Sequence, residues 1–285
     1  RLVETTWAAD DLMRDSASLP TSLLAQAAGN EVKVVFSGEG GDEVFAGYGR
    51  YRTGAVERWF KNALFPGTGG FRARGDLRGG LDRQLLAPAL REAAQRWREP
   101  LIAAWRSYPP SWTDLMRMQA LDLTHALPDN LLVKADRMLM AYGVEGRMPF
   151  VDRRVVEFGL SLPDAVKTDG KSGKLLVRQW AQSFMPSEHL SAKKRGFHVP
   201  INDWWRGERL ARLSAVLRSS NAVREWLQPA GVDALTARQK AHGNVGGMLM
   251  AVLQFAIWHK LFVEGSGARP PAQIDPLVFL ERGYD

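Results

Sequence analysis

The sequence predicts an α/β fold in which most of this chain is helical and the strands are few and short. The clearest sign is the stretch 34–48, where three β-favouring apolar residues run into a glycine-rich turn and then into the start of a helix. Elsewhere most apolar residues recur at helical spacing between proline and glycine stops. The 285 residues are enough for one large domain or two small ones. We expect a single domain over 1–285 with an extended, proline-containing tail at 265–285.

The glycine-rich turn, residues 37–43 (Ser-Gly-Glu-Gly-Gly-Asp-Glu), is the strongest candidate for a ligand site. It would follow a buried strand, 34–36, and open α/β sheets bind ligands at that end of their strands. Its glycines allow a sharp turn with exposed backbone. Asp42 and Glu43 would stand in the first helical turn, where the helix dipole favours acids.

The chemistry of this turn differs from that of an ordinary phosphate loop, because it carries three acids and no lysine. Carboxylates repel phosphate unless a divalent cation lies between them, and Mg²⁺ is typically held by one or two carboxylates together with substrate phosphates. The turn therefore indicates either a magnesium–nucleotide complex or a cationic amine. A tight turn with solvated acids is the alternative.

Composition excludes several classes of function. The chain has no cysteine, which rules out disulfides, thiolate metal sites and a cysteine nucleophile. Its net charge is +7, yet the basic residues are scattered, and the densest cluster, 193–195, is not interleaved with aromatic residues. Small anionic substrates are therefore favoured over nucleic acid, with binding to an anionic polymer as an alternative.

No signal peptide or membrane span is apparent in the sequence. The most apolar stretch, 245–262, is interrupted by Gln254, His259 and Lys260, which favours a buried helix. We therefore expect a cytoplasmic protein with no membrane association.

Residues 113–143 predict two successive helices, the second opened by Pro128 and ended by Gly143. The second helix carries Lys134 and Asp136 on a largely apolar background. These charges form either a structural ion network or part of a ligand site, and the sequence favours neither.

Glu145 and Arg147 alternate with apolar neighbours, so they point to the same side if this stretch is extended. Arginine is suited to a bidentate contact with a carboxylate. Together the two side chains could grip the α-amino and α-carboxylate groups of an amino acid, or they could pair with each other. The sequence leaves both interpretations open.

Four stretches, 37–48, 127–138, 143–152 and 191–200, follow one another with residues that resemble the motifs of glutamine-hydrolysing asparagine synthetases. The chain is similar to the C-terminal part of their ATP-pyrophosphatase-type synthetase domain. Gly146 stands where the family commonly has alanine. The family's pyrophosphate motif, Ser-Gly-Gly-x-Asp-Ser, and its glutaminase cysteine do not occur in this sequence. The resemblance implies that an upstream phosphate-loop part and a glutaminase domain or subunit complete the protein.

The resemblance implies an adenine nucleotide α-hydrolase-like parent fold with a parallel sheet. It also implies ATP-dependent amide formation, in which aspartate, ATP and ammonia from glutamine give asparagine, AMP and diphosphate through a β-aspartyl-AMP intermediate. ATP and Mg²⁺ would be the cofactors, and a homodimer is left open. A related amidotransferase or β-lactam synthetase-like enzyme acting on another carboxylate is the alternative, as is a fragment that is inactive on its own.

Position in the family's motifs assigns the nucleotide contacts to the glycine-rich turn. Ser37, Gly38 and Gly40 would contact the nucleotide. Asp42 would bind Mg²⁺ and pyrophosphate. These roles are implied by the resemblance and not by the spacing of the residues.

The resemblance also implies two catalytic residues. Glu39 would lie beside the acyl-adenylate and assist the attacking ammonia, and Lys194 would stabilise phosphate charge as a mobile point charge. Four further residues are candidates for binding the amino-acid substrate: Lys134, Asp136, Glu145 and Arg147.

Overall fold

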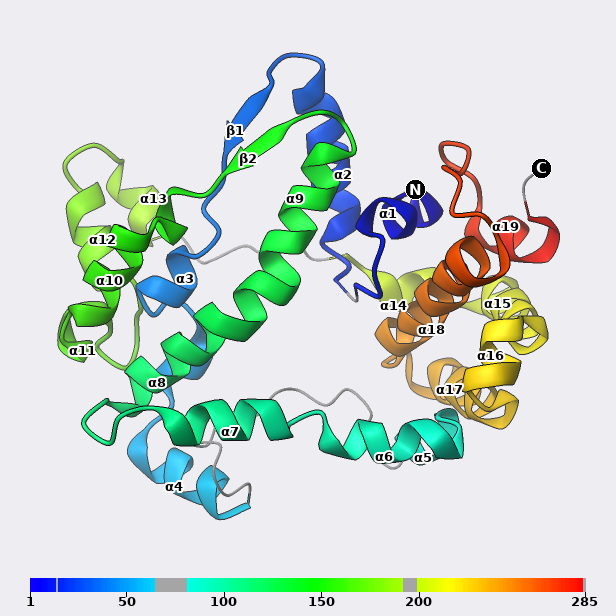
Figure 1. The fold of residues 1–285 in the computed structure, drawn as a ribbon, viewed down its shortest axis with the longest axis horizontal. Coiled ribbons are helices and arrows are strands. Elements are labelled where there is room, and N and C mark those ends of the chain that lie inside the picture. Colours follow the sequence, from blue (N-terminus) through cyan, green and yellow to red (C-terminus); the bar gives the residue numbers. More distant parts are fainter. Residues whose placement is uncertain (14, 65–80, 192–198, 284–285) are drawn as a thin grey trace.

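The computed structural model describes residues 1–13, 15–64, 81–191 and 199–283, and most of these residues are helical (Figure 1). The first third of the chain holds α1 (Leu2–Ala9), α2 (Ser18–Gly29), β1 (Val34–Phe36), α3 (Gly41–Val44), η1 (Gly49–Arg52), α4 (Ala55–Leu64), α5 (Leu81–Leu85), α6 (Pro88–Arg96) and α7 (Glu99–Ser107). The middle of the chain holds α8 (Asp114–Leu121), η3 (Asp122–Leu132), α9 (Val133–Met140), β2 (Glu145–Arg147), η4 (Pro149–Val151), α10 (Arg153–Ser161), α11 (Asp164–Lys167), α12 (Leu175–Ala181) and α13 (Ser187–Ser191). The C-terminal lobe consists of α14 (Ile201–Trp204), α15 (Gly207–Ser219), α16 (Asn221–Trp226), α17 (Pro229–His242), α18 (Gly246–His259), η5 (Lys260–Glu264) and α19 (Pro276–Arg282).

β1 and β2 form a two-stranded parallel sheet in which Val35 lies opposite Gly146. A mostly helical chain with few short strands is thus confirmed, whereas the expectation of a buried first strand is wrong. Val34 and Phe36 are 46% and 79% exposed, and only Val35 turns inward, onto a small apolar cluster that includes Val144. The physical reason is that β2 is the only strand paired with β1 among the described residues, so β1 forms a sheet edge.

A continuous helical arm runs diagonally through the molecule from α8 through η3 into α9 (Figure 1). The sequence predicted a break at Pro128, but that residue lies inside η3, which is π-helical. Proline cannot donate a backbone hydrogen bond, and the widened π-helical turns accommodate it within the arm. Gly143 adopts a positive φ of 66° just beyond α9, as expected of a residue that ends a helix.

The largest hydrophobic core fills the C-terminal lobe and is built around α18, whose Leu249, Leu253 and Ile257 are fully buried. α18 and η5 together, residues Gly246–Glu264, form the one helix in the described part of the chain that is long and apolar enough to cross a membrane. Because 56% of this stretch is buried inside the molecule, the prediction of a buried helix is confirmed. α1 contacts both α18 and α9, and so joins the lobe to the helical arm.

The C-terminal tail differs from the extended segment that the sequence predicted. Residues 276–282 form α19 instead of an extended segment. Asp275 caps this helix, because its Oδ1 accepts hydrogen bonds from the backbone N–H groups of Leu277 and Val278. Pro276 occupies the first helical position, where a proline is favoured, so it begins a helix here and does not prevent one.

Candidate functional site

The loop that follows β1, residues 37–48 and hereafter the acidic loop, has the predicted shape. The backbone N–H of Ser37 donates to the carbonyl oxygen of Arg147 at 2.8 Å and so extends the pairing of the two strands by one residue. Gly40 has a φ of 87°, which glycine adopts without strain, and α3 begins directly after it. Gly38 has open space beside it, because a Cβ there would meet no atom within 4 Å. The turn therefore leaves backbone accessible to a ligand.

The three acids of the acidic loop differ in their surroundings. Glu43 is buried and accepts a hydrogen bond of 2.6 Å from the hydroxyl of Tyr48. Burial raises the pKa of the Glu43 carboxyl, and the hydrogen bond from Tyr48 opposes that shift. Glu39 and Asp42 stay partly exposed. Only these two carboxylates therefore remain for contact with a ligand.

Asp42 lies in the first turn of α3, as predicted, and it faces a lysine that is not among the predicted site residues. The Nζ atom of Lys174 is 3.1 Å from Oδ1 of Asp42. Gly47 makes this approach possible, because a Cβ at that position would be 1.8 Å from the same oxygen and 2.5 Å from Cε of Lys174. The one feature of the sequence that could have pointed to Lys174 as a site residue is its place at the end of a polar turn, directly before a helix. Nothing in the sequence links that turn to Asp42.

Glu39 faces a second lysine. Lys134 of α9 is only 8% exposed, and its Nζ lies 3.7 Å from Oε1 of Glu39 and 3.1 Å from Oδ2 of Asp15. The structure thus brings Glu39 and Lys134 together, as a shared site requires. Asp15, from the segment before α2, was not among the predicted residues, and no motif in the sequence singles it out.

The other substrate-binding candidates do not join this group. Asp136 is exposed on α9 and forms no ion pair with a residue that the structure describes. Glu145 and Arg147 point to the same side of β2, as an extended stretch requires, and they pair with each other at 2.8 Å. Of the two interpretations left open by the sequence, mutual pairing is the one present here. Lys194 lies outside the described residues.

The far end of the acidic loop is anchored on a buried carboxylate. Asp122 accepts hydrogen bonds from Nε and Nη2 of Arg50, at 3.0 and 2.8 Å, and from the hydroxyl of Tyr51. Burial raises the pKa of the Tyr51 hydroxyl, and the Asp122 carboxylate raises it further. η1, which follows the loop, is therefore held against the helical arm.

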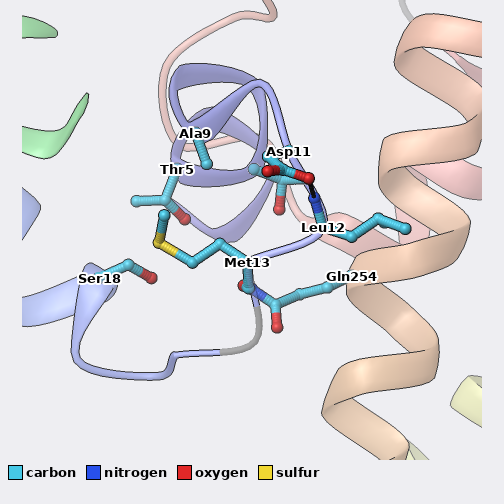
Figure 2. Close-up of a pocket in the computed structure, with 8 residues that line it drawn as sticks. Thr5, Ala9, Asp11, Leu12, Met13, Ser18 and Gln254 are labelled. Atoms are coloured by element: carbon cyan, nitrogen blue, oxygen red, sulfur yellow. Dashed lines mark hydrogen bonds between the residues drawn. The ribbon is translucent and has the colours of Figure 1, made fainter. Parts of the chain in front are cut away.

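A pocket beside the segment 10–18 is too small for a substrate (Figure 2). It is lined from α1, from the chain before α2 and from α18, where Gln254 donates to the carbonyl oxygen of Met13 at 3.3 Å. Its volume of about 10 Å³ fits one water molecule. The acidic loop remains the better candidate site.

Lys167 is a fully buried lysine behind the acidic loop, and its pKa predicts a pH dependence of stability. Burial lowers the pKa of Lys167 from 10.5. Between the lowered value and 10.5 the folded protein binds fewer protons than the unfolded chain, so its stability rises with pH across this window. As the pH drops to the folded pKa this stability is lost, and below that pKa the contribution of Lys167 no longer changes with pH. We expect the unfolding free energy of the protein, relative to that of its Lys167→Met variant, to increase from pH 7 to 10 in urea titrations.

A matched variant separates this effect from the loss of one positive charge. Lys260→Met removes a lysine from the C-terminal lobe, where Nζ donates to the carbonyl oxygen of Leu280 at 2.6 Å. Its titration supplies the baseline for the comparison. The difference in unfolding free energy between Lys167→Met and the unsubstituted protein could stay the same at every pH. That result would show that the buried lysine does not cause the pH dependence of stability.

The arrangement defines the class of site. A parallel strand, a glycine-rich turn and a helix start place two carboxylates beside two lysines, Asp42 with Lys174 and Glu39 with Lys134. Among the described residues there is no cluster of three or more acids and histidines able to hold a metal alone. Such a loop suits a cation that arrives with the phosphates of its ligand, which is how α/β proteins commonly bind Mg²⁺ and nucleotides.

Comparison with known proteins identifies the family of the chain. Residues 1–260 match the family described as asparagine synthase. The chain is 27% identical to asparagine synthetase (glutamine-hydrolyzing) 1 of Bacillus subtilis strain 168, over 92% of this chain and 46% of that protein. It is 32% identical to a putative asparagine synthetase (glutamine-hydrolyzing) of Mycobacterium tuberculosis strain ATCC 25618 / H37Rv, over 93% of this chain and 45% of that protein. The chain belongs to the asparagine synthase family, and it spans less than half the length of these relatives.

Proposed function

We propose that this chain supplies the metal-and-acyl half of an asparagine synthetase active site. The observation that carries the proposal is the partly exposed Asp42 at the start of α3, in a glycine-rich turn and 3.1 Å from Lys174. In the proposed reaction, a β-carboxylate oxygen of aspartate attacks the α-phosphorus of ATP and pyrophosphate leaves. Ammonia derived from glutamine then attacks the acyl carbon of β-aspartyl-AMP, loses a proton and expels AMP. The family match and the names of the relatives support this reaction.

Asp42 is the proposed ligand for Mg²⁺, which would neutralise charge on the phosphates. The fit rests on the donor: Asp42 presents carboxylate oxygen, the ligand that Mg²⁺ prefers, beside open backbone at Gly38. Lys174 then becomes free to contact phosphate oxygens. Gly38 offers exposed backbone against which the nucleotide would lie, and in this proposal Ser37 and the buried Gly40 complete the turn around it.

Glu39 and Lys134 form the proposed acyl side of the site. Glu39 would accept the proton that the attacking ammonia loses, and Lys134 would hold the Glu39 carboxylate in place while it does so. Lys194 would add a positive charge near the phosphates. In this proposal Glu145, Arg147 and Asp136 bind the amino-acid substrate, and Glu145 and Arg147 exchange their mutual ion pair for its charged groups.

The parent fold proposed for the complete protein is a parallel sheet of the adenine nucleotide α-hydrolase type. Two residues of β1, Val34 and Phe36, expose apolar side chains. This exposure supports the proposal that further strands or helices cover this edge in the full-length protein. In the same proposal a glutaminase domain provides ammonia, the present residues form one domain, and the protein is cytoplasmic.

The exchange of labelled pyrophosphate into ATP tests the proposed reaction. The full-length protein is expected to catalyse this exchange when aspartate and Mg²⁺ are present, because adenylation is reversible until ammonia attacks. Glutamate and other amino-acid carboxylates serve as competing substrates. Exchange that depends on another carboxylate and not on aspartate would assign the chain to a related amide-forming enzyme, and the absence of exchange with any of them would refute adenylation.

The 285 residues on their own are expected to show no exchange. Pyrophosphate is held in this family by a Ser-Gly-Gly-x-Asp-Ser motif, which the sequence does not contain. Without these contacts the developing charge on the leaving pyrophosphate is only partly stabilised. The purified chain and the full-length protein are compared in the same assay at equal concentration. Robust exchange by the chain alone would contradict this division of the site.

A further inference from the structure

A buried amide holds the end of α3, the short helix that carries Asp42. Gln119 of α8 is fully buried, and its side-chain N–H groups donate to the carbonyl oxygens of Glu43 and Val44, each at 2.7 Å. With the amide reversed, its oxygen would face two carbonyl oxygens, so its neighbours determine its orientation. The last two carbonyls of α3 are therefore fixed by one side chain.

Lys167 holds the same amide from the other side. Its Nζ donates to Oε1 of Gln119 at 2.9 Å, and the residue is 0% exposed. Lys167 ends α11, and the chain continues into the turn 168–174, which is closed by the bridge between Thr168 and Gly173. That turn ends at Lys174, the residue that faces Asp42. Lys167 thus stands at the base of the turn that presents Lys174.

α3 and the turn 168–174 are consequently joined twice. The backbone N–H of Lys174 donates to the carbonyl oxygen of Phe45 at 3.0 Å, and Lys167 reaches the preceding carbonyls of α3 through Gln119. A single connection would leave a hinge between the two elements. Two connections fix both the distance and the orientation with which Asp42 and Lys174 meet.

Lysine is an unfavourable residue at this position if it only fills space. A buried ammonium group loses its hydration, which lowers the pKa of Lys167, and methionine would occupy similar volume without that loss. A cationic donor does, however, polarise the amide it binds and strengthens the hydrogen bonds made by the N–H groups of that amide. In this site those hydrogen bonds are the ones from Gln119 to α3.

We propose that Lys167, acting through Gln119, is a positioning residue that sets the separation of Asp42 and Lys174 and thereby the affinity of the acidic loop for a magnesium–nucleotide complex. The inference rests on the proposed function. It assigns to two residues behind the loop a control over metal and nucleotide binding, although neither touches the ligand.

Two variants of the full-length protein break the connection at opposite ends. Lys167→Met removes the cation and leaves the Gln119 amide, whereas Gln119→Glu keeps an acceptor for Lys167 and replaces the N–H donors by an oxygen that faces two carbonyls. In the pyrophosphate exchange assay, both are expected to raise the Mg²⁺ concentration for half-maximal rate and the KM for ATP by about 10-fold. Calorimetric titration with Mg²⁺ and ATP in the absence of aspartate, which needs no turnover, should show the dissociation constant raised by the same factor. The rate at saturating Mg²⁺ and ATP should stay within about threefold of the unsubstituted protein, because the reacting groups themselves are unchanged.

The control is Lys260→Met, which makes the same substitution in the C-terminal lobe. It is expected to leave both constants unchanged. The positioning role would be overturned if Lys167→Met left the half-maximal Mg²⁺ concentration and the KM for ATP unchanged. It would also be overturned if the variant lost rate and thermal stability without a change in either constant. If the unsubstituted protein shows no exchange, the proposed function fails and this inference fails with it. If the unsubstituted protein exchanges and the variants keep its constants, only this inference fails, so the two failures are distinguishable.

Discussion

Asp42→Asn is expected to lower the rate of aspartate-dependent pyrophosphate exchange in the full-length protein by about 10²–10³-fold. The substitution keeps the size of the side chain but removes the negative charge that the proposal gives to Mg²⁺. Lys174 would then stand opposite a neutral amide. The pair is partly exposed, so stability should change by no more than about 1 kcal/mol. The exchange rate and the thermal unfolding midpoint, measured on the same preparation, separate the two effects.

Asp233→Asn provides the matched control for Asp42→Asn. Asp233 of α17 pairs with Arg218 at 3.2 Å in the C-terminal lobe, and it is more exposed than Asp42. This variant should retain the full exchange rate. A double variant, Asp42→Asn with Lys174→Met, tests whether the pair acts as a unit, because the second change should then add less than it costs alone. Exchange by Asp42→Asn at the unsubstituted rate would remove Asp42 from the site.

Gly47→Ala is the second change with a large expected effect. The added Cβ would lie 1.8 Å from Oδ1 of Asp42 and 2.5 Å from Cε of Lys174, so the two side chains must move apart. Displacement of reacting or binding groups by about 1 Å commonly lowers rates by about 10²-fold. We expect an exchange rate reduced by that factor, with a loss of stability of about 1–3 kcal/mol from overpacking.

Gly54→Ala is the control for Gly47→Ala, because a Cβ at Gly54 meets no atom within 4 Å. This variant should exchange pyrophosphate normally. Gly173→Ala gives a third comparison: its Cβ would lie 2.0 Å from the carbonyl oxygen of Ala46, which is backbone and cannot turn aside, so folding itself should suffer. A Gly47→Ala variant with normal exchange would show that the contact between Asp42 and Lys174 is not needed.

Local pattern was sufficient for the acidic loop. The apolar run at 34–36, the glycines and the acids after them predicted a strand, a sharp turn and a helix start, and the structure has β1, a positive φ at Gly40 and α3. Asp42 was placed correctly in the first helical turn for the same reason. These features depend on residues close in sequence, whose backbone preferences act directly on one another.

Proline was the residue type that local pattern interpreted least well. Pro128 was expected to open a helix and lies inside η3, whereas Pro276 was expected in an extended tail and begins α19. A proline only removes a donor and restricts φ, so it fits the first turn of a helix, a π-helical segment or an extended chain. Which of these forms is decided by the neighbours, such as Asp275 as the cap of α19.

The sequence by itself determined the family, the helical character of the chain and the acidic loop, including the positions of Glu39 and Asp42. Only the tertiary structure decided what those acids face. It turned Glu43 inward to Tyr48, brought Lys174 to Asp42 and set Lys134 between Glu39 and Asp15. The physical reason is that an ion pair or a buried hydrogen bond depends on distance in space, and residues far apart along the chain acquire that distance only when the elements between them pack.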